Sequence, residues 1–461
     1  MKILVTGATG LIGSMLCRKL CQEGHEVRIL SRRKDPSFHG LPVRAFQWKN
    51  PQDRPPREAF EELDSVINLM GEPILGGIYT KAKEKAIWDS RVLATQQIAK
   101  ALKDAGSNLK SYVGASAIGY YPFTSSTQRE GMPAGDHNLA RLCQAWEAAH
   151  KQVNQCEHQS IVRIGLVLSA MSPMFQATIR SGLWHTLPQF GSGDQYQSWI
   201  HIDDLTNLFL EACHGRIEGE INGVAGATTS RELNEQMGSY FRGPMIKIPV
   251  PSFILKAVAG PPADVLVKGQ RIESTALTKS KFKLRYTDAN LDAALKNCLN
   301  LSKNPRTGVL EPCFRFEAFQ YLPKDTEVVW PFFSDPYNLE KITPKMLKFH
   351  ITNINTKEIQ AESLIEYKLR LRGIPIRWKT LIESYDPNKS FVDTQLKGPY
   401  RIWHHTHTFE SCGQGTLMTD RVNYQLPLLP FGMVALPIIA KDIKEIFNYR
   451  QTVIKDIFKV A

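Results

Sequence analysis

The 461-residue chain lacks the features that mark secreted or membrane-spanning proteins. Its eight cysteines form no C-x-x-C pair, which disfavours a metal or redox motif of that type and fits a reducing, cytoplasmic setting. The first residues enter a strand pattern directly, so we expect no signal peptide. The most apolar late stretch, residues 426–440, is short and contains three prolines, so we expect no membrane span.

A concentrated basic block is also missing, although the net charge is +12 and the pI is about 9.2. The lysines and arginines are spread along the chain and are best explained as solvated surface, so no nucleic-acid binding is expected. The hydrophobic content of 43% suffices for packed cores. The length predicts two or three domains and leaves the oligomeric state open.

A glycine-rich turn near the N-terminus organises the first domain. An apolar strand at residues 3–5 leads into TGATGLIG at residues 6–13, an amphipathic segment follows, and a second strand spans residues 26–30. Strand, glycine turn, helix and strand form the first half of a dinucleotide-binding unit. The turn would allow the pyrophosphate to meet the N–H groups of the helix. The predicted cofactor contacts here are Gly7, Thr9, Gly10, Leu11, Ile12 and Gly13.

The tip of the second strand indicates which dinucleotide binds. An acidic residue there would bind the ribose hydroxyl of NAD, whereas arginine suits the 2′-phosphate of NADP. The chain has Ser31, Arg32 and Arg33 at this place. We therefore predict NADP(H) in preference to NAD(H), with Ser31 and Arg32 as contacts.

The alternation of strands and helices continues after the first unit. Strands are predicted at residues 65–71, 111–116 and 160–168, and helices at residues 81–102 and 139–154. Such alternation is typical of an α/β protein with a Rossmann-like, doubly wound parallel sheet. We assign this domain, with its substrate-facing elements, to residues 1–221.

Several motifs in this order carry a family resemblance: TGATGLIG (6–13), NLMGEP (68–73), SRV (90–92), SAIGYY (116–121), WE (146–147), RIGLVL (163–168) and SWIHIDD (198–204). With them the chain resembles an extended short-chain dehydrogenase/reductase of the sugar-nucleotide epimerase-like branch. The resemblance implies a small-molecule substrate, with Met70, Gly71 and Arg163 beside the cofactor and Ser116 hydrogen-bonded to the substrate.

The catalytic pair of that superfamily is replaced. It uses a tyrosine and a lysine four residues later, and these positions fall on Leu139 and Cys143. A phenol with a pKa near 10 needs such a lysine to act at neutral pH. Ser116 remains, and Arg91 takes the place of the usual asparagine. We predict Ser116, Arg91 and Tyr120 as catalytic candidates, although Tyr120 is equally explained as an aromatic wall for the substrate.

Residues 222–300 resemble the C-terminal extension of the same branch, packed on the first domain. Within it a helix is predicted at residues 230–241, with Ser230 as its N-cap. In the first domain, Asp203 of the motif at residues 198–204 is expected either to cap the helix that directly follows this motif or to line the pocket.

Residues 301–312 are polar and rich in chain breakers, so we predict a linker there. The pattern from residue 313 to 461 changes to one strand (314–321), two short helices (326–333 and 336–342), six strands and a long helix (436–459). The six strands are predicted at residues 348–354, 362–370, 376–385, 390–397, 403–411 and 416–425. This order indicates an α+β helix-grip domain, an antiparallel sheet around a long helix.

The second domain also carries a resemblance, on VWPFFSDP (329–336), GPY (398–400), WHHTHTF (403–409), GTLM (415–418) and DRV (420–422). It resembles START-like and polyketide-cyclase-like (SRPBCC) ligand-binding domains. The resemblance implies an apolar cavity for an apolar or amphipathic ligand.

Two histidines on one strand of this domain need separate attention. His405 and His407 share a face because side chains alternate along a strand, whereas His404 points the other way. The pair would bind a metal with Asp420, form a polar sheet surface or make polar contacts in a cavity. Spacing fixes no third ligand, so the sequence assigns no metal site.

Two hypotheses follow. The chain is an NADP(H)-dependent reductase or epimerase fused to a ligand-binding domain, or it is a non-catalytic nucleotide-binding sensor or ligand carrier. The replaced tyrosine and lysine favour the second hypothesis, whereas the intact glycine turn and Ser116 favour the first.

Overall fold

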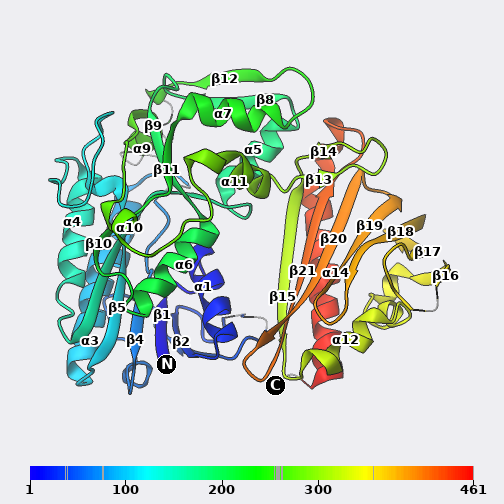
Figure 1. The fold of residues 1–461 in the computed structure, drawn as a ribbon, viewed down its shortest axis with the longest axis horizontal. Helices are drawn as coiled ribbons and strands as arrows, with labels where there is room; N and C mark the ends of the chain where they lie inside the picture. Colours follow the sequence, from blue (N-terminus) through cyan, green and yellow to red (C-terminus); the bar gives the residue numbers. More distant parts are fainter. Residues whose placement is uncertain are drawn as a thin grey trace.

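The computed structural model describes residues 1–36, 38, 40–74, 77–253, 255, 260, 263–356 and 358–459. Within them the chain forms two seven-stranded sheets, which lie on opposite sides of the molecule (Figure 1).

The first sheet is entirely parallel, with strand order β10-β6-β5-β4-β1-β2-β3. Its strands are β1 (Lys2–Thr6), β2 (Glu26–Ser31), β3 (Val43–Gln47), β4 (Ser65–Asn68), β5 (Leu109–Ala117), β6 (Cys156–Ile164) and β10 (Gly219–Gly223). The order reverses between β1 and β4. Ligands of open parallel sheets bind at such a switch point, outside the carboxyl ends of the strands.

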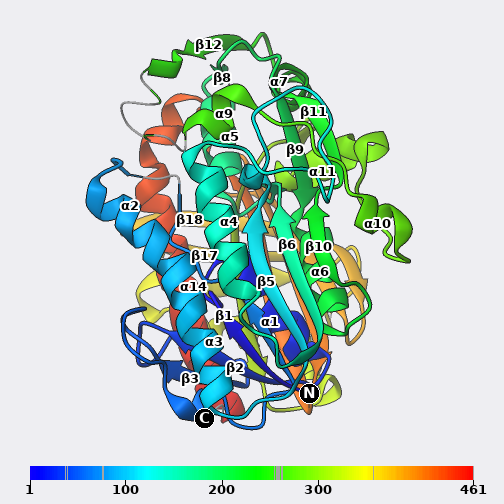
Figure 2. The same cartoon turned by 90° about the vertical axis from the view of Figure 1, so that its left-hand side faces the viewer.

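Helices cover both faces of this sheet. They are α1 (Leu11–Gln22), α2 (Lys81–Trp88), α3 (Ala94–Asp104), α4 (Asn138–His150) and α6 (Ile202–Cys213). Helices α1 and α6 pack together on one face, whereas α3 and α4 lie on the other, in front of the strands in Figure 2. Helices α2 and α3 are joined by a π-helical turn, η2 (Asp89–Leu93), so the predicted helix at 81–102 is interrupted near its middle.

Most of the smaller elements stand above the carboxyl ends of the parallel strands, whereas α10 lies beside the edge strand β10 (Figure 1, Figure 2). They comprise the three-stranded sheet β11-β9-β7, the pair β12-β8 and five helices. Their bounds are β7 (Leu166–Leu168), β8 (Thr186–Phe190), β9 (Tyr196–His201), β11 (Gly226–Thr229), β12 (Ile246–Val250), α5 (Pro173–Gly182), α7 (Ser230–Ser239), α9 (Asp264–Lys268), α10 (Thr275–Lys279) and α11 (Leu291–Cys298).

Two predicted helix caps are wrong by a small shift. Helix α7 is capped by Thr229, which forms a reciprocal capping box with Glu232, and not by Ser230. Helix α6 is capped by His201, whose Nδ1 accepts the Asp203 N–H at 3.2 Å. Asp203 therefore lies in the first turn of α6 and does not cap it.

The second sheet is antiparallel, with order β15-β21-β20-β19-β18-β17-β16. Its strands are β15 (Phe314–Leu322), β16 (His350–Ile354), β17 (Leu364–Leu371), β18 (Ile374–Asp386), β19 (Ser390–Lys397), β20 (Ile402–Cys412) and β21 (Gly415–Gln425). Helices α12 (Thr326–Ser334) and α13 (Asn338–Lys341) follow β15, and the long helix α14 (Leu436–Phe458) ends the domain. Along α14 the buried residues Ile443, Phe447, Arg450 and Ile454 recur at helical spacing, so one face packs on the sheet.

The segment predicted as a plain linker contains structure of its own. Short strands β13 (Ser302–Lys303) and β14 (Leu310–Glu311) pair antiparallel. Glu311 in β14 accepts two hydrogen bonds from Arg401, at 3.0 and 3.1 Å. The connection is therefore tied to the second sheet and does not hang free.

Helix α1 joins the two sheets. Its Arg18 pairs with Glu317 of β15 at 3.0 Å and lies 4.3 Å from the centre of the Phe319 ring. One turn later Gln22 donates to Glu410 of β20 at 2.9 Å. The helix that follows the glycine turn thus packs on the outer face of the second sheet.

The eight cysteines form no disulfide. Among the described residues, we find no helix with the length and apolar character needed to cross a bilayer.

Candidate functional site

The glycine turn has the close backbone contacts that its residues predict. Gly7 has φ +64°, and a Cβ there would lie 2.5 Å from the Leu69 carbonyl oxygen. A Cβ at Gly13 would lie 2.4 Å from the Gly7 carbonyl oxygen. At Gly10 the nearest such atom is 3.2 Å away, with φ of −79°. The turn is therefore closed on its inner side by Gly7 and Gly13 and open at Gly10.

The start of α1 can receive an anion. The first bond of the helix, from the Ser14 N–H to the Gly10 carbonyl at 3.0 Å, leaves the N–H groups of Leu11, Ile12 and Gly13 ahead of it. Gly10 supplies no side-chain cap, and the first turn has no acidic residue. Thr9 and Gly10 are exposed. These features fit the pyrophosphate of a dinucleotide.

The tip of β2 remains available to a ligand. Ser31 accepts the Arg33 N–H at 3.1 Å, and the Arg32 carbonyl accepts from Gln47 at 3.1 Å. Within the described part of the chain, neither the Arg32 nor the Arg33 guanidinium forms a salt bridge, and both residues are exposed. A 2′-phosphate would therefore meet an uncommitted positive charge here.

An apolar pocket of about 390 Å³ opens beside the glycine turn. Its lining brings together predicted positions from distant parts of the sequence: Ile12, Gly71, Arg91, Ser116, Leu139 and Cys143. Leu139 and Cys143 thus face the pocket, as their alignment with the tyrosine and lysine positions implies. Met70, Tyr120 and Arg163 do not belong to the lining residues.

Ser116 is held by a buried ion pair that the sequence did not reveal. Its Oγ donates to Glu147 Oε1 at 2.7 Å. Arg163 donates to both Glu147 oxygens, each at 2.8 Å, and both side chains are at most 5% exposed. The guanidinium of Arg163 is therefore engaged behind the pocket, and it fixes Ser116 through Glu147.

The tyrosine pair also lies behind the pocket wall. The Arg163 guanidinium lies 3.7 Å from the centre of the Tyr120 ring. The Tyr121 hydroxyl accepts from Arg163 and donates to Asn222, both at 2.8 Å. Burial raises the pKa of Tyr121 even though Arg163 opposes the shift. The structure thus gives Tyr120 a packing contact and no place among the pocket residues.

Arg91 is the charged group of the pocket. It lies in the π-helical turn η2, a kind of irregularity common at functional sites. Its Nη1 donates to the carbonyl oxygens of Glu72 at 2.9 Å and Ile87 at 3.3 Å, and its guanidinium lies against Gly71. Burial lowers the pKa of Arg91 to about 10, so the side chain still carries its charge at neutral pH.

The residues at the tyrosine and lysine positions do not reproduce that chemistry. Leu139 has no proton to exchange. Burial raises the pKa of the Cys143 thiol to about 12, which keeps the sulfur protonated and neutral. The tyrosine and the lysine of the superfamily's pair are therefore both absent from their expected positions in this pocket.

A second cavity, of about 180 Å³, lies between the antiparallel sheet and the helices that cover it. Aromatic and aliphatic side chains form most of its wall, among them Tyr367 of β17, Trp378 of β18 and Phe447 of α14. Asp393, His405, His407 and Arg450 bring ionisable groups into it. The stretch 426–437, which contains three prolines, contributes no residue to the lining and therefore does not close this cavity.

Parallel sheet, glycine turn and adjoining pocket define the first part as a dinucleotide-binding α/β protein. Comparison with known proteins agrees: the chain belongs to the NAD dependent epimerase/dehydratase family, whose model matches residues 3–222. A domain of unknown function, DUF1731, matches residues 250–298. Residues 299–461 lie beyond both models.

Relatives cover the same part of the chain. It is 33% identical over 309 residues to the human epimerase family protein SDR39U1, which covers 64% of this chain and is itself 99% covered. It is 32% identical over 308 residues to a chloroplastic SDR39U1 homolog of Arabidopsis thaliana, with 62% and 84% covered. The crystal structure of human SDR39U1 with NADPH superposes with a TM-score of 0.57 at 29% identity, covering 65% of this chain and 99% of that one.

Proposed function

We propose that the chain is an NADP(H)-dependent reductase or epimerase fused to a domain that binds a small apolar or amphipathic ligand. Residues 1–221 and the extension 222–300 would form the nucleotide-binding part, and residues 313–461 the ligand-binding part. The observation that carries the cofactor assignment is the uncommitted Arg32 at the tip of β2, next to an open glycine turn. The NADPH in the structure of human SDR39U1 supports the same assignment.

In this proposal the pocket residues orient the substrate. Bound NADPH supplies the hydride, and the apolar walls exclude water from the pocket. Ser116 donates its proton to Glu147, so towards a substrate hydroxyl its oxygen would act as a hydrogen-bond acceptor. Arg91 brings a positive charge that stabilises an anionic oxygen in an apolar setting.

A second candidate function is a nucleotide-binding sensor or carrier that performs no hydride transfer. The specific observation in its favour is that Leu139 and Cys143 both face the pocket, where the superfamily has its acid and its activating lysine. In this alternative the nucleotide signals redox state and the second domain carries the ligand.

Nucleotide titration separates these possibilities. NADPH and NADH are titrated separately while nicotinamide fluorescence is followed. We expect tighter binding of NADPH, with loss of affinity in Gly10→Asp and loss of the NADPH preference in Arg32→Glu. Arg33→Glu is the matched control because it changes the same charge one residue later. Failure of the wild type to bind either nucleotide contradicts the cofactor assignment.

Turnover is then tested with NADP⁺ or NADPH and a panel of sugar nucleotides, apolar alcohols and apolar ketones, by absorbance. Turnover that is lost in Ser116→Ala supports the enzyme. Tight NADPH binding without turnover favours the sensor.

The ligand-binding role of residues 313–461 is tested with an apolar fluorescent dye. Leu369 lines the second cavity, so Leu369→Trp should fill it and abolish dye binding. Leu139→Trp fills the nucleotide-domain pocket instead and serves as the matched control. Dye binding that survives Leu369→Trp and disappears in Leu139→Trp contradicts this role.

A further inference from the structure

Four ionisable side chains meet at the second sheet, and three of them, Asp393, His405 and His407, line its cavity. Asp393 lies on β19, His405 and His407 on β20, and Asp420 on β21. The register places His405 opposite Asp393 and His407 opposite Asp420. The two imidazole rings lie with their centres 3.8 Å apart and their planes tilted by 40°. The sequence shows the two histidines on one face, but only the pairing of β19 with β20 brings Asp393 to them.

Asp393, His405 and His407 each place one possible metal-ligand atom close to those of the other two. Asp393 Oδ2 lies 3.2 Å from His405 Nδ1 and 3.1 Å from His407 Nε2, and all three atoms lie within 4.8 Å of one another. A tetrahedral site with metal–ligand distances of about 2.0–2.1 Å has edges of about 3.3 Å. The two separations from Asp393, 3.1 and 3.2 Å, are close to that edge.

The remaining nitrogens of both histidines face a second carboxylate. Asp420 Oδ1 lies 3.0 Å from His405 Nε2 and 2.7 Å from His407 Nδ1. Arg450 of α14 lies 3.9 Å from the same oxygen and balances its charge. Metal-binding histidines commonly donate their other N–H to a carboxylate, which fixes the tautomer and the ring orientation. Asp420 is placed to do this for both rings at once.

The burial of the group leaves one ring nitrogen without a hydrogen bond. Asp420 is 6% exposed, and His405 and His407 are 5% and 3% exposed. His405 Nε2 is hydrogen-bonded to Asp420, and His407 Nε2 is hydrogen-bonded to Asp393. Among the described residues, the buried Nδ1 of His407 has no hydrogen-bond partner, although Asp420 Oδ1 lies 2.7 Å away. A metal ion on His407 Nε2 would leave Nδ1 to carry the proton and donate it to Asp420.

We propose that Asp393, His405 and His407 bind one divalent transition-metal ion of the zinc or iron type, with an open coordination position that faces the aromatic cavity. Two histidines and one carboxylate are a ligand set that zinc and non-haem iron both accept. The metal and Asp393 together carry one positive charge. A ligand completing the site would therefore combine an apolar body with an anionic oxygen. Only this choice of ligand rests on the proposed ligand-binding function; metal binding itself does not.

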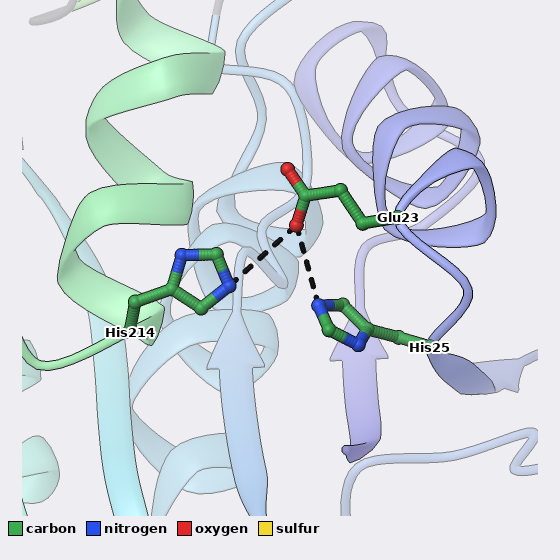
Figure 3. A group of neighbouring side chains, drawn as sticks. All are labelled: Glu23, His25 and His214. Atoms are coloured by element: carbon green, nitrogen blue, oxygen red, sulfur yellow. Dashed lines mark ion pairs between the residues drawn. The ribbon is translucent and has the colours of Figure 1, made fainter.

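Another cluster offers the same residue types and is less suited to a metal. Glu23 Oε2 lies 3.2 Å from His25 Nε2 and 3.5 Å from His214 Nε2 (Figure 3). The Glu23 side chain is 40% exposed. The Nδ1 of His25 faces the amino group of Met1 at 3.3 Å, and the buried Nδ1 of His214 has no hydrogen-bond partner among the described residues. In this part of the chain, no second carboxylate orients these rings, so the cluster serves as an internal comparison.

The experiment uses the full-length protein after removal of metals with a chelator. Titration with Co²⁺, followed by visible absorption, and competition by Zn²⁺ report the affinity and the ligand environment. We expect one Co²⁺ per chain, displaced by Zn²⁺. Binding at this site should be lost in His407→Ala and in Asp393→Asn. Asp420→Asn keeps the direct ligands and should weaken binding by about 10–100-fold.

Two control variants locate the metal. His404→Gln changes a histidine on the opposite face of β20, and His214→Gln disrupts the other cluster, so both should bind Co²⁺ as the wild type does. Circular dichroism checks the fold of each variant, and Asp393→Asn decides the question if His407→Ala does not fold. Absence of Co²⁺ and Zn²⁺ binding to the wild type overturns the proposal. Binding that survives Asp393→Asn and is lost in His214→Gln does so too.

Discussion

His150 shows at the residue scale how burial sets a titration. The imidazole is fully buried, accepts from the Tyr112 hydroxyl at 2.8 Å and donates to the Ala115 carbonyl at 3.0 Å. Burial lowers its pKa to about 4, although the Ala115 carbonyl opposes the shift. Between about pH 6.5 and pH 4 the His150 imidazole is protonated in the unfolded chain but neutral in the folded protein. Stability from this group is therefore complete above pH 6.5 and is lost as the pH falls towards 4.

The expected loss is about 3 kcal/mol, since each pKa unit corresponds to about 1.4 kcal/mol. Urea unfolding of the wild type and of His150→Gln between pH 7 and pH 4 measures it. The variant should lose less stability over that range, whatever its stability at pH 7. Parallel curves for the two proteins would show that His150 does not titrate in this way.

Glu147 is a second residue whose role depends on burial. Glu147→Gln removes one charge of a buried, bidentate pair and leaves the Arg163 guanidinium uncompensated. Breaking such a pair typically costs about 3–5 kcal/mol. We expect a loss of that size in urea unfolding. Glu218→Gln, which alters an exposed pair with His158, should change stability by less than about 1 kcal/mol. Equal effects of the two substitutions would contradict the assigned role.

The site illustrates which residues sequence can predict. Ser116 was predicted because it ends a strand inside a recognisable motif, and the structure places it in the pocket with Arg91. The function of Glu147 was missed because its partner, Arg163, comes from the next strand and only the packing of α4 on β6 joins them. Tyr120 was chosen for its distance along the chain from Ser116. The turn after β5 instead stacks its ring on Arg163.

At the scale of elements, two glycines of the turn have different roles: Gly13 allows α1 to pack on the turn, whereas Gly10 leaves room for the phosphate. A methyl group at Gly13 would meet the Gly7 carbonyl oxygen at 2.4 Å and displace α1 from the turn. Overpacking of this kind costs about 1–3 kcal/mol. At Gly10 the corresponding contact is 3.2 Å with ordinary backbone angles, so alanine would strain the turn less than at Gly13, and its methyl group would occupy the approach of the phosphate.

We therefore expect Gly13→Ala to unfold at lower urea concentration than the wild type. Gly10→Ala should retain stability and lose affinity for NADPH. Fluorescence titration with NADPH beside urea unfolding tests both expectations. An unchanged NADPH affinity in Gly10→Ala, or unchanged stability in Gly13→Ala, would contradict them.

Strands and long helices were largely predictable, whereas caps and irregular turns were not. The predicted strands of the second sheet lie close to their observed bounds, because side chains alternate between the two faces of a sheet and most of these strands show that alternation in their burial, although β21 is buried along almost its whole length. The π-helical turn at Asp89–Leu93 was not predicted. Over only five residues, its periodicity differs too little from that of the flanking α-helices to be visible in the sequence. The strands β13 and β14 have two residues each and contain no period at all.

At the scale of the whole molecule, α1 connects the candidate nucleotide site to the second sheet. Its first turn meets the proposed phosphates, and its Arg18 pairs with Glu317 of β15. Burial would raise the pKa of Glu317, but Arg18 and Arg421 together lower it to about 2. The carboxylate therefore stays ionised across the physiological range, and the contact between the two sheets is an ion pair under those conditions.

This geometry predicts that NADPH stabilises the second sheet, although it binds the first. A ligand present at 100 times its Kd stabilises the folded state by about 2.7 kcal/mol. This stabilisation extends to every segment that unfolds only together with the ligand's binding site. Hydrogen exchange of β15 and β21 should therefore slow when NADPH is added to the wild type. Arg18→Ala removes the ion pair between Glu317 and α1 but leaves the contact of Gln22 with Glu410. The slowing of exchange in β15 and β21 by NADPH should therefore be smaller than in the wild type. Lys19→Ala is the matched control, because Lys19 contacts Asn207 of α6 within the first part of the chain. Exchange in wild-type β15 and β21 that is insensitive to NADPH would mean that the two sheets open independently of each other.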